Sequence, residues 1–246
     1  MKGIILAAGS GTRLRPLTNV IEKSLLPVGR YPMILRSIYK LKHAGITDIL
    51  VVINRRSSIT NLLGDGEGFG VEITYKVQNE PLGVAHALSL AEHFCAGDNC
   101  IVLLADNIFE DELAPYINSY KGYGAKVLLK EVTDPQRFGV DPQRFGVVEL
   151  KDGKIISIEE KPAVPKSNLV TTGVYIYDKQ VFDIIRTLQP SIRGEYEITD
   201  VNKVYLAEGT LDCDIFEGWW IDAGTFDSLH LANILCKDLD YHGKCR

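Results

Sequence analysis

Short apolar runs alternate along the first half of the chain with longer segments in which apolar residues recur at helical spacing. A short apolar run bounded by turn residues is typical of a buried strand, and the wider spacing is typical of one face of a helix. The strand-like runs are Ile4–Ala8, Asp48–Ile53, Val71–Val77, Cys100–Ala105 and Ala125–Val132, and the helical segments are Pro32–Gly45, Gly83–Phe94 and Asp111–Lys121. This alternation predicts a largely parallel sheet with helices on both faces.

The pattern changes from about residue 145 onwards. Three strand-like segments follow one another without intervening helices, and a turn is expected at Asp152-Gly153. These strands are Arg144–Leu150, Lys154–Ile158 and Val170–Tyr177, and the later helices are Lys179–Leu188, Ile198–Glu208 and Thr225–Leu239. Because no linker rich in Pro and Ser separates the halves, we expect a single domain over residues 1–246, with lobes of about 1–132 and 133–246.

Composition narrows the class of protein. A length of 246 residues suits one large α/β domain, and the net charge of −5 argues against a nucleic-acid-binding surface. The five cysteines form no CxxC pair, so neither a disulfide framework nor a zinc site is indicated. No stretch approaches the ~18–20 apolar residues of a membrane span. We therefore expect a cytoplasmic protein with no nucleic-acid or membrane partner.

The segment DPQRFGV occurs twice in tandem, at Asp134–Val140 and at Asp141–Val147. One interpretation is a loop expansion that the surface tolerates, because lengthening a loop costs little entropy. The other is that the extra copy perturbs a nearby binding site or promotes strand exchange between subunits. A single duplicated heptapeptide does not indicate a repeat architecture.

The first chemical motif is LAAGSGTRLRP, which runs from Leu6 to Pro16. A strand enters a turn with two glycines, where backbone N–H groups can face a phosphate without obstruction. Arg13 and Arg15 follow at once, and a guanidinium can pair with phosphate oxygens in a bidentate manner. The spacing matches neither GxGxxG nor a Walker A motif, so the segment predicts a phosphate-binding turn of another kind.

Lys23 follows this turn within the segment EKSLLPV. A lone lysine is most often a solvated surface charge. Beside a phosphate-binding turn, however, a second cation would help to neutralise the charge that develops on a leaving pyrophosphate.

Two aspartates occupy comparable places in the pattern. Asp106 follows a buried strand, where open α/β sheets bind ligands, and Asp222 stands between an apolar segment and a glycine turn. Mg²⁺ typically takes one or two carboxylates together with phosphate oxygens, so the pair predicts a magnesium site. Asp106 could instead cap the helix expected from Asp111, and Thr225 could cap the last helix without excluding a metal site beside it.

Two further motifs carry cations. Lys161 lies in IEEKP, which read alone is a plain exposed cluster of opposite charges. Arg193 lies in RGEYEITD and is a candidate phosphate clamp, while Glu195 and Glu197 are candidates for surface residues or for contacts to sugar hydroxyls.

In this order, the segments ILAAGSGTRL, KSLLPVGRYPMI, RFGVVEL, IEEKP, RGEYEITDVN and WWIDAGT closely resemble the glucose-1-phosphate thymidylyltransferase family. The resemblance implies a three-layer α/β/α sandwich with a mixed, mostly parallel central sheet. It implies Mg²⁺-dependent transfer of a nucleotidyl group from dTTP to glucose 1-phosphate, with release of pyrophosphate. It also implies a homo-oligomer, a dimer or tetramer, in which the first lobe binds nucleotide and the second, with the C-terminal helix, binds sugar.

The resemblance assigns roles residue by residue. The nucleotide would be held by Leu6, Ala8, Gly9, Ser10, Gly11, Thr12 and Arg13, with Gln78 and Gly83 at the base. Lys23 would contact its phosphates, and Asp106 and Asp222 would bind Mg²⁺. The sugar phosphate would be surrounded by Gly146, Glu160, Lys161, Thr171, Tyr175 and Arg193. Arg13, Lys23, Lys161, Asp106 and Asp222 would be the catalytic groups.

Three positions depart from the family pattern. Ala8-Gly9 stands where two glycines are usual, and Ala105 precedes Asp106 where a glycine is usual. The duplication leaves two glycines as candidates for the sugar contact, and we assign it to Gly146 because the second copy is contiguous with the next strand. Two alternatives remain open: the same chemistry with UTP or another sugar 1-phosphate, and a non-catalytic homologue that binds sugar nucleotides.

Overall fold

The computed structural model describes residues 1–132, 144–237 and 239. Its centre is a nine-stranded sheet in which β10, β9, β11, β6, β1, β4 and β5 lie side by side in that order. β8 pairs with β11, and β12 pairs with β8. The strands are β1 (Lys2–Leu6), β4 (Asp48–Asn54), β5 (Glu72–Gln78), β6 (Cys100–Leu104), β8 (Ala125–Glu131), β9 (Gly146–Lys151), β10 (Lys154–Glu160), β11 (Leu169–Tyr177) and β12 (Leu211–Ile215).

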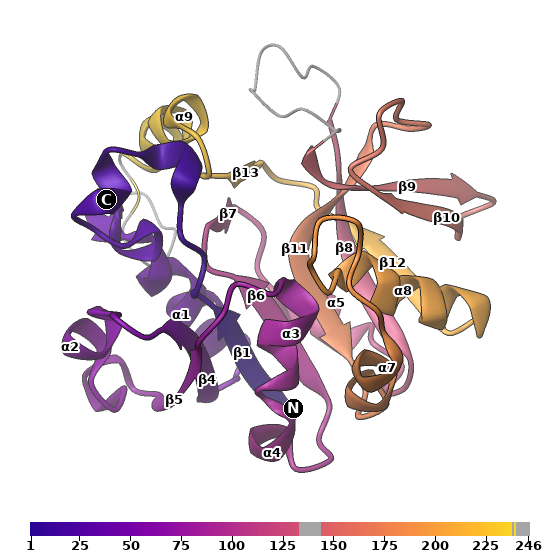
Figure 1. Ribbon diagram of the computed structural model, residues 1–246, viewed down its shortest axis with the longest axis horizontal. Coiled ribbons are helices and arrows are strands. Elements are labelled where there is room, and N and C mark those ends of the chain that lie inside the picture. Colours follow the sequence, from indigo (N-terminus) through magenta and orange to yellow (C-terminus); the bar gives the residue numbers. More distant parts are fainter. Residues whose placement is uncertain (133–143, 238, 240–246) are drawn as a thin grey trace.

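The sheet is mixed but mostly parallel. β1 pairs in parallel with β4 and β6, β4 with β5, and β8 with β12. β11 is antiparallel to β6, β8 and β9, and β10 is antiparallel to β9. All strands of this sheet except β10 and β11 therefore run in one direction, and Figure 1 shows β1 and β6 at its centre.

Alternation along β1 explains why both faces of the sheet are covered. Ile5 and Ala7 belong to one buried cluster, whereas Ile4 and Leu6 belong to the other. Successive side chains of a strand point to opposite faces, so a run that is apolar throughout needs a layer on each side. The expected α/β/α layering is confirmed.

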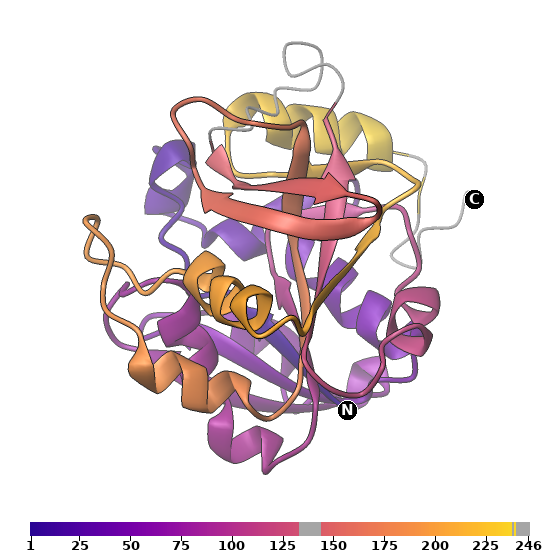
Figure 2. The ribbon, with the colours of Figure 1, turned by 90° about the vertical axis from the view of Figure 1, so that its right-hand side faces the viewer.

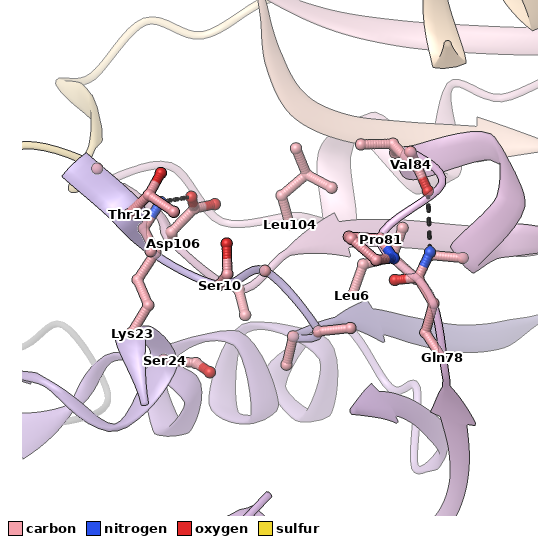
Figure 3. Close-up of a pocket in the computed structure, with 18 of the residues that line it drawn as sticks. Leu6, Ser10, Thr12, Lys23, Ser24, Gln78, Pro81, Val84, Leu104 and Asp106 are labelled. Atoms are coloured by element: carbon pink, nitrogen blue, oxygen red, sulfur yellow. Dashed lines mark hydrogen bonds and ion pairs between the residues drawn. The ribbon is translucent and has the colours of Figure 1, made fainter. Parts of the chain in front are cut away.

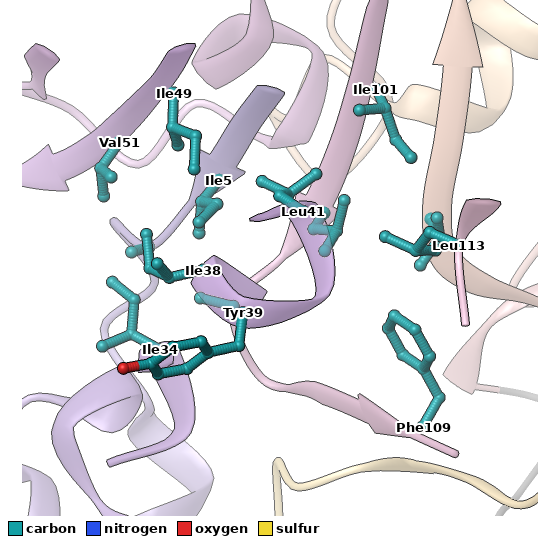
Figure 4. Close-up of a cluster of buried hydrophobic side chains, with 14 of the residues drawn as sticks. Ile5, Ile34, Ile38, Tyr39, Leu41, Ile49, Val51, Ile101, Phe109 and Leu113 are labelled. Atoms are coloured by element: carbon teal, nitrogen blue, oxygen red, sulfur yellow. The ribbon is translucent and has the colours of Figure 1, made fainter. Parts of the chain in front are cut away.

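Helices α1 (Met33–His43), α2 (Ile59–Leu63) and α5 (Ala114–Asn118) cover one face. Figure 4 shows Ile34 and Ile38 of α1 turned towards Ile5 and Val51 of the sheet. Helices α3 (Val84–Ser89), α4 (Glu92–Cys95), α7 (Val181–Thr187) and α8 (Ile198–Ala207) supply the other face. The view in Figure 2 shows the β9–β10 hairpin above α8, which packs against β10.

A third cluster lies under the last helix, α9 (Phe226–Cys236). Leu229 and Ala232 of α9 pack there with Leu14 and Met33. The small ladders β2 (Pro27–Val28) with β3 (Tyr31–Pro32) and β7 (Asn107–Phe109) with β13 (Trp220–Asp222) complete this part. Thr225 caps α9 through a reciprocal pair of hydrogen bonds with Ser228, so the expected capping role is confirmed.

Two expected helices are wrong in extent. Gly83–Phe94 forms two short helices, and the Ser89 hydroxyl at the end of the first donates to the His86 carbonyl instead of facing solvent. The helix expected over Asp111–Lys121 is only Ala114–Asn118, because the Asp111 carboxylate accepts hydrogen bonds from the backbone of Glu217 and Gly218 at 2.9 and 2.8 Å.

The short strands β2, β3, β7, β12 and β13 were not expected from the pattern. Most of them have too few residues to show a period of their own. Within the described residues, no helix is long and apolar enough to cross a membrane. The first DPQRFGV copy and the start of the second lie outside the described residues, so neither interpretation of the duplication is tested.

Candidate functional site

A cavity of about 310 Å³ opens where β1 and β6 end. The two strands are paired so that Leu6 lies opposite Leu104, and the Ala105 N–H still donates to the Leu6 carbonyl at 3.1 Å. Beyond this point the chains diverge, which leaves space at the carboxyl end of the sheet. The cavity is lined by Leu6, Ala7, Ala8, Gly9, Ser10, Gly11, Thr12, Arg13, Lys23, Ser24, Gln78, Pro81, Gly83, Val84, Ala87, Leu104, Ala105, Asp106, Glu195 and Gly224.

The glycine-rich turn has a specific need for Gly11. Its φ of 62° lies in the left-handed region, and a Cβ there would meet Thr18 Cγ2 at 2.8 Å and Lys23 Cβ at 3.1 Å. The Thr18 hydroxyl donates to the Gly11 carbonyl at 2.8 Å, and the fully buried Leu14 anchors the following turn. Gly9, by contrast, has no atom within 4 Å of the place of a Cβ. The turn is therefore fixed at one end and open towards the cavity at the other.

Lys23 lies between the two aspartates. Its ammonium forms an ion pair with Asp106 and lies 3.9 Å from Asp222 Oδ1. Two guanidinium groups approach the other oxygen of Asp222, that of Arg144 at 2.7 Å and that of Arg13 at 3.7 Å. Three cations thus face two carboxylates at one end of the cavity, and Figure 3 shows Lys23 reaching Asp106 there.

The ladder of β7 and β13 brings these aspartates together. Asp222 pairs opposite Asn107, and the Ala223 N–H donates to the Asp106 carbonyl at 2.9 Å. The Asn107 side chain donates to Asp106 Oδ1 at 2.9 Å and accepts from the indole N–H of Trp220 at 3.0 Å. Asn107 therefore orients one carboxylate while it is held by the strand that carries the other. Asp106 does not cap a helix at Asp111.

The carboxylates differ in their electrostatic environment. Burial acts to raise the pKa of Asp106, but the Lys23 ammonium outweighs it and holds that pKa below its ordinary value. Burial and the neighbouring Asp106 raise the pKa of Asp222. Among the described residues, Asp222 Oδ1 is buried and accepts no hydrogen bond. In the part of the chain that the structure describes, no three His, Cys, Asp or Glu side chains lie close enough together to hold a metal ion. A cation here would therefore bind the two carboxylates and take its remaining ligands from water or from a bound substrate.

Gln78 and Gly83 form the opposite end of the cavity. Gln78 Nε2 donates to the Gly83 carbonyl at 3.2 Å, a bond that is drawn in Figure 3. Gly83 has a φ of 103°, and a Cβ on it would meet the Tyr196 carbonyl oxygen at 2.6 Å. Only glycine fits between the cavity and this neighbouring backbone.

A second cluster gathers side chains of β9, β10 and β11. Gly146 lies close to two hydroxyls, because its Cβ would meet Oγ1 of Thr171 at 3.0 Å and of Thr199 at 3.1 Å. Glu160 accepts from the Thr199 hydroxyl at 2.5 Å. Burial raises the pKa of Tyr175, whose hydroxyl is hydrogen-bonded to Thr171. The structure thus brings Gly146, Glu160, Thr171 and Tyr175 together.

Lys161 and Arg193 flank Glu160. Their nitrogens lie 3.4 and 3.5 Å from Glu160 Oε1, and Arg193 also pairs with Glu197 at 2.7 Å. The side chains are 39% and 36% exposed, so both cations can exchange a carboxylate for an incoming anion at modest cost. The alternative of an exposed cluster of opposite charges agrees with these contacts and does not exclude a phosphate-binding role.

The predicted nucleotide residues all line the first cavity, together with Lys23 and Asp106. Asp222 and the six candidate sugar residues do not line it; Asp222 borders it through Lys23, and the sugar residues form the second cluster. Sequence reasoning missed Ser24, Glu195 and Gly224 as lining residues and Arg144 as a partner of Asp222. Gly224 follows Asp222 within a motif already recognised, whereas Arg144 was hidden in the duplicated segment.

Comparison with known proteins agrees with this geometry. The family model for nucleotidyl transferases matches residues 2–238. The chain is 44% identical over 242 residues to a glucose-1-phosphate thymidylyltransferase of Neisseria meningitidis, covering 94% of this chain and 81% of that one. It is 41% identical over 241 residues to the low-salt glycan biosynthesis nucleotidyltransferase Agl11 of Haloferax volcanii, covering 96% of this chain and 66% of that protein.

A solved structure is also similar to this chain in fold and in sequence. A Bacillus anthracis protein assigned as a glucose-1-phosphate thymidylyltransferase, in complex with sucrose, superposes with a TM-score of 0.91. It is 49% identical, and the match covers 98% of this chain and 96% of that chain. The family model spans nearly the whole chain, including the glycine-rich turn and the strands of the central sheet. The chain therefore belongs to the nucleotidyl transferase family.

Proposed function

We propose that the protein transfers a nucleotidyl group from dTTP to glucose 1-phosphate and releases pyrophosphate. The observation that carries the proposal is the cavity at the end of β1, where a glycine-rich turn faces three cations and two carboxylates. The cluster around Glu160 supplies hydroxyl-binding groups beside it. Relatives with the thymidylyltransferase name match over nearly all of this chain.

The reaction proposed is an in-line displacement at the α-phosphorus of the triphosphate. An oxygen of the sugar phosphate forms the new P–O bond, and the bond to the bridging oxygen of the departing pyrophosphate breaks. A phosphate monoester dianion is already nucleophilic, so no general base is needed. The rate enhancement would come from positioning two anions and neutralising their charge.

The chain's own cations would provide most of that neutralisation. Arg13 and Lys23 lie beside the turn that would hold the triphosphate, and Lys161 and Arg193 would hold the phosphate of the sugar. Each is now paired with a carboxylate or lies close to one. Incoming phosphate oxygens would replace part of these contacts.

Asp106 and Asp222 would hold Mg²⁺. The buried Asp222 Oδ1 accepts no hydrogen bond and fits such an ion, since a divalent cation would bind this oxygen directly. When bound, the ion would neutralise phosphate charge and help to align the phosphates. Asn107 would keep Asp106 in place as a ligand.

The nucleobase leaves an alternative substrate open. The amide oxygen of Gln78 can accept from the imide N–H that thymine and uracil share, so UTP remains a second candidate. Purified protein with Mg²⁺ and glucose 1-phosphate, mixed with each triphosphate in turn, would be assayed for pyrophosphate. Release with dTTP supports the proposal, release only with UTP selects the alternative, and no release with any triphosphate supports a non-catalytic homologue.

Two substitutions test the site itself. Asp106→Asn and Lys161→Ala should each lower turnover by orders of magnitude while the fold is retained. Lys166→Ala is the matched control, because Lys166 is 61% exposed and lies 3.9 Å from Glu149 in a simple surface pair. Near wild-type pyrophosphate release from either site variant would overturn the assignment. We also propose a cytoplasmic location and, as the resemblance implies, assembly into a dimer or tetramer.

A further inference from the structure

Two acceptors lie against the amide nitrogen of Gln78: the carbonyl of Gly83, which belongs to the cavity wall, and the ring of His86, which does not line the cavity. The nitrogen is 3.2 Å from the Gly83 carbonyl oxygen and 3.0 Å from Nδ1 of His86. A carbonyl oxygen only accepts, so the amide atom beside it must be the nitrogen. Its second hydrogen is then directed at Nδ1, which accepts it and leaves the His86 ring proton on Nε2.

The amide oxygen of Gln78 is consequently turned towards the cavity, as Figure 3 shows. Gln78 itself is only 9% exposed and belongs to the cavity wall. No group in the described part of the chain donates to this oxygen. The cavity wall therefore presents a hydrogen-bond acceptor. Its direction is fixed by the contacts that the amide nitrogen makes with Gly83 and His86.

The turn that holds the amide is itself fixed by the backbone of Tyr196. The Ala85 N–H donates to the Tyr196 carbonyl at 3.1 Å, and the Tyr196 N–H donates to the Leu82 carbonyl at 2.8 Å. The His86 ring lies 6.4 Å from the Tyr196 ring, between centroids. These contacts fix the backbone that carries His86, and its half-buried ring lies beside Tyr196 and Gln78.

The direction of the amide decides which base it accepts. Thymine and uracil present an N3–H donor, which fits the amide oxygen, whereas cytosine presents an N3 acceptor, which the oxygen repels. A reversed amide would offer its N–H groups instead and would favour cytosine. A site built around one polar edge discriminates strongly against the opposite edge.

We propose that His86 is a positioning residue that holds the Gln78 amide in its imide-reading direction and so excludes cytosine nucleotides. The inference rests on the proposed function, because it concerns the base of the proposed nucleotide substrate. His86 does not line the cavity and acts through Gln78 alone. Losing one neutral hydrogen bond should lower the preference for dTTP over CTP by about five- to tenfold.

The test compares kcat/KM for dTTP and CTP in His86→Phe and His86→Asn. Phenylalanine keeps a ring against Tyr196 but has no acceptor, and asparagine can return an acceptor at a similar reach. We expect His86→Phe to lower the dTTP-to-CTP ratio, mainly through the KM for dTTP, and His86→Asn to restore it. His93→Phe, the same change at an exposed histidine of α4, should leave the ratio unchanged. His86→Leu replaces His86→Phe if the latter does not fold.

A double-mutant cycle shows whether the effect passes through Gln78. In a Gln78→Ala background, His86→Phe should have no further effect on the ratio. An unchanged ratio in the single variant, or an equal effect in both backgrounds, would overturn the role of His86. Calorimetric titration with dTTP and CTP, without glucose 1-phosphate, measures the same discrimination in binding alone. It therefore tests His86 even if the chain forms no pyrophosphate, in which case only the proposed function would fail.

Discussion

Gly224→Ala should damage the site without weakening the fold. A Cβ on Gly224 would lie 2.7 Å from Asp222 Oδ1 and 2.8 Å from the Arg13 guanidinium. Ordinary contact begins near 3.4 Å, so the methyl group must push these two groups back by roughly 0.6–0.7 Å each. The φ of Gly224 is not positive, so alanine adds no backbone strain. The damage should therefore stay local to the carboxylate and the guanidinium.

A misplacement approaching 1 Å in a catalytic site costs up to ~10²-fold in rate, so we expect kcat/KM to fall about ten- to a hundredfold. The free energy of unfolding should change by less than about 1 kcal/mol. Pyrophosphate release and thermal melting would be measured on Gly224→Ala and on Gly68→Ala, where a Cβ meets nothing within 4 Å. Activity of Gly224→Ala within threefold of the Gly68 control would refute the reasoning.

Two further predictions concern stability. Gly83→Ala should lower the free energy of unfolding by about 3 kcal/mol and the Tm by roughly 6–12 °C. The reason is that the new Cβ would sit on a residue with a φ of 103° and would lie 2.6 Å from the Tyr196 carbonyl oxygen. A melting temperature within about 2 °C of wild type would contradict this. The second prediction uses the pKa of Asp222, which burial raises above the ordinary Asp value. A raised pKa means that the metal-free fold loses stability as the pH rises from the ordinary Asp range through the pKa of the folded state, because the carboxylate must then ionise in a buried place. Asp222→Asn should therefore be at least as stable as wild type at pH ~7.5 in EDTA and should lose that advantage near pH ~3.5. Denaturant titrations at both pH values measure the difference. A variant that is less stable than wild type at the higher pH would count against burial as the dominant cause of the raised pKa.

Much of the fold follows from local patterns, and the failures have a common cause. The apolar run of β1 and the helix α1 were predicted because burial on a sheet and on a helix face imposes different periods. The helix after Asp111 was predicted too long because the place where it begins depends on the hydrogen bond between Asp111 and Gly218, which is distant in the sequence. Short ladders such as β7 with β13 form only because distant segments pair, so no periodic pattern within either segment predicts them.

The site divides in the same way. The turn from Gly9 to Arg13 carries its signal in consecutive residues, and all of it lines the cavity as expected. Contacts between side chains of different elements left no such signal: Arg144 reaches Asp222, and His86 contacts Gln78. A histidine inside an apolar helical segment is indistinguishable by sequence from one that merely packs. Only the fold shows which atom of its ring meets another polar group.

The pairing of β7 with β13 also sets the order in which a growing chain acquires its site. The glycine-rich turn, Lys23 and Asp106 are synthesised early, but Asp222 arrives more than a hundred residues later, on β13. Until then, a nascent chain contains the turn but lacks the second carboxylate, and Trp220 is not there to hold Asn107. A chain released before β13 would carry the glycine-rich turn without the complete charge cluster. Pairing of β7 with β13 is thus the folding step that brings the two carboxylates together.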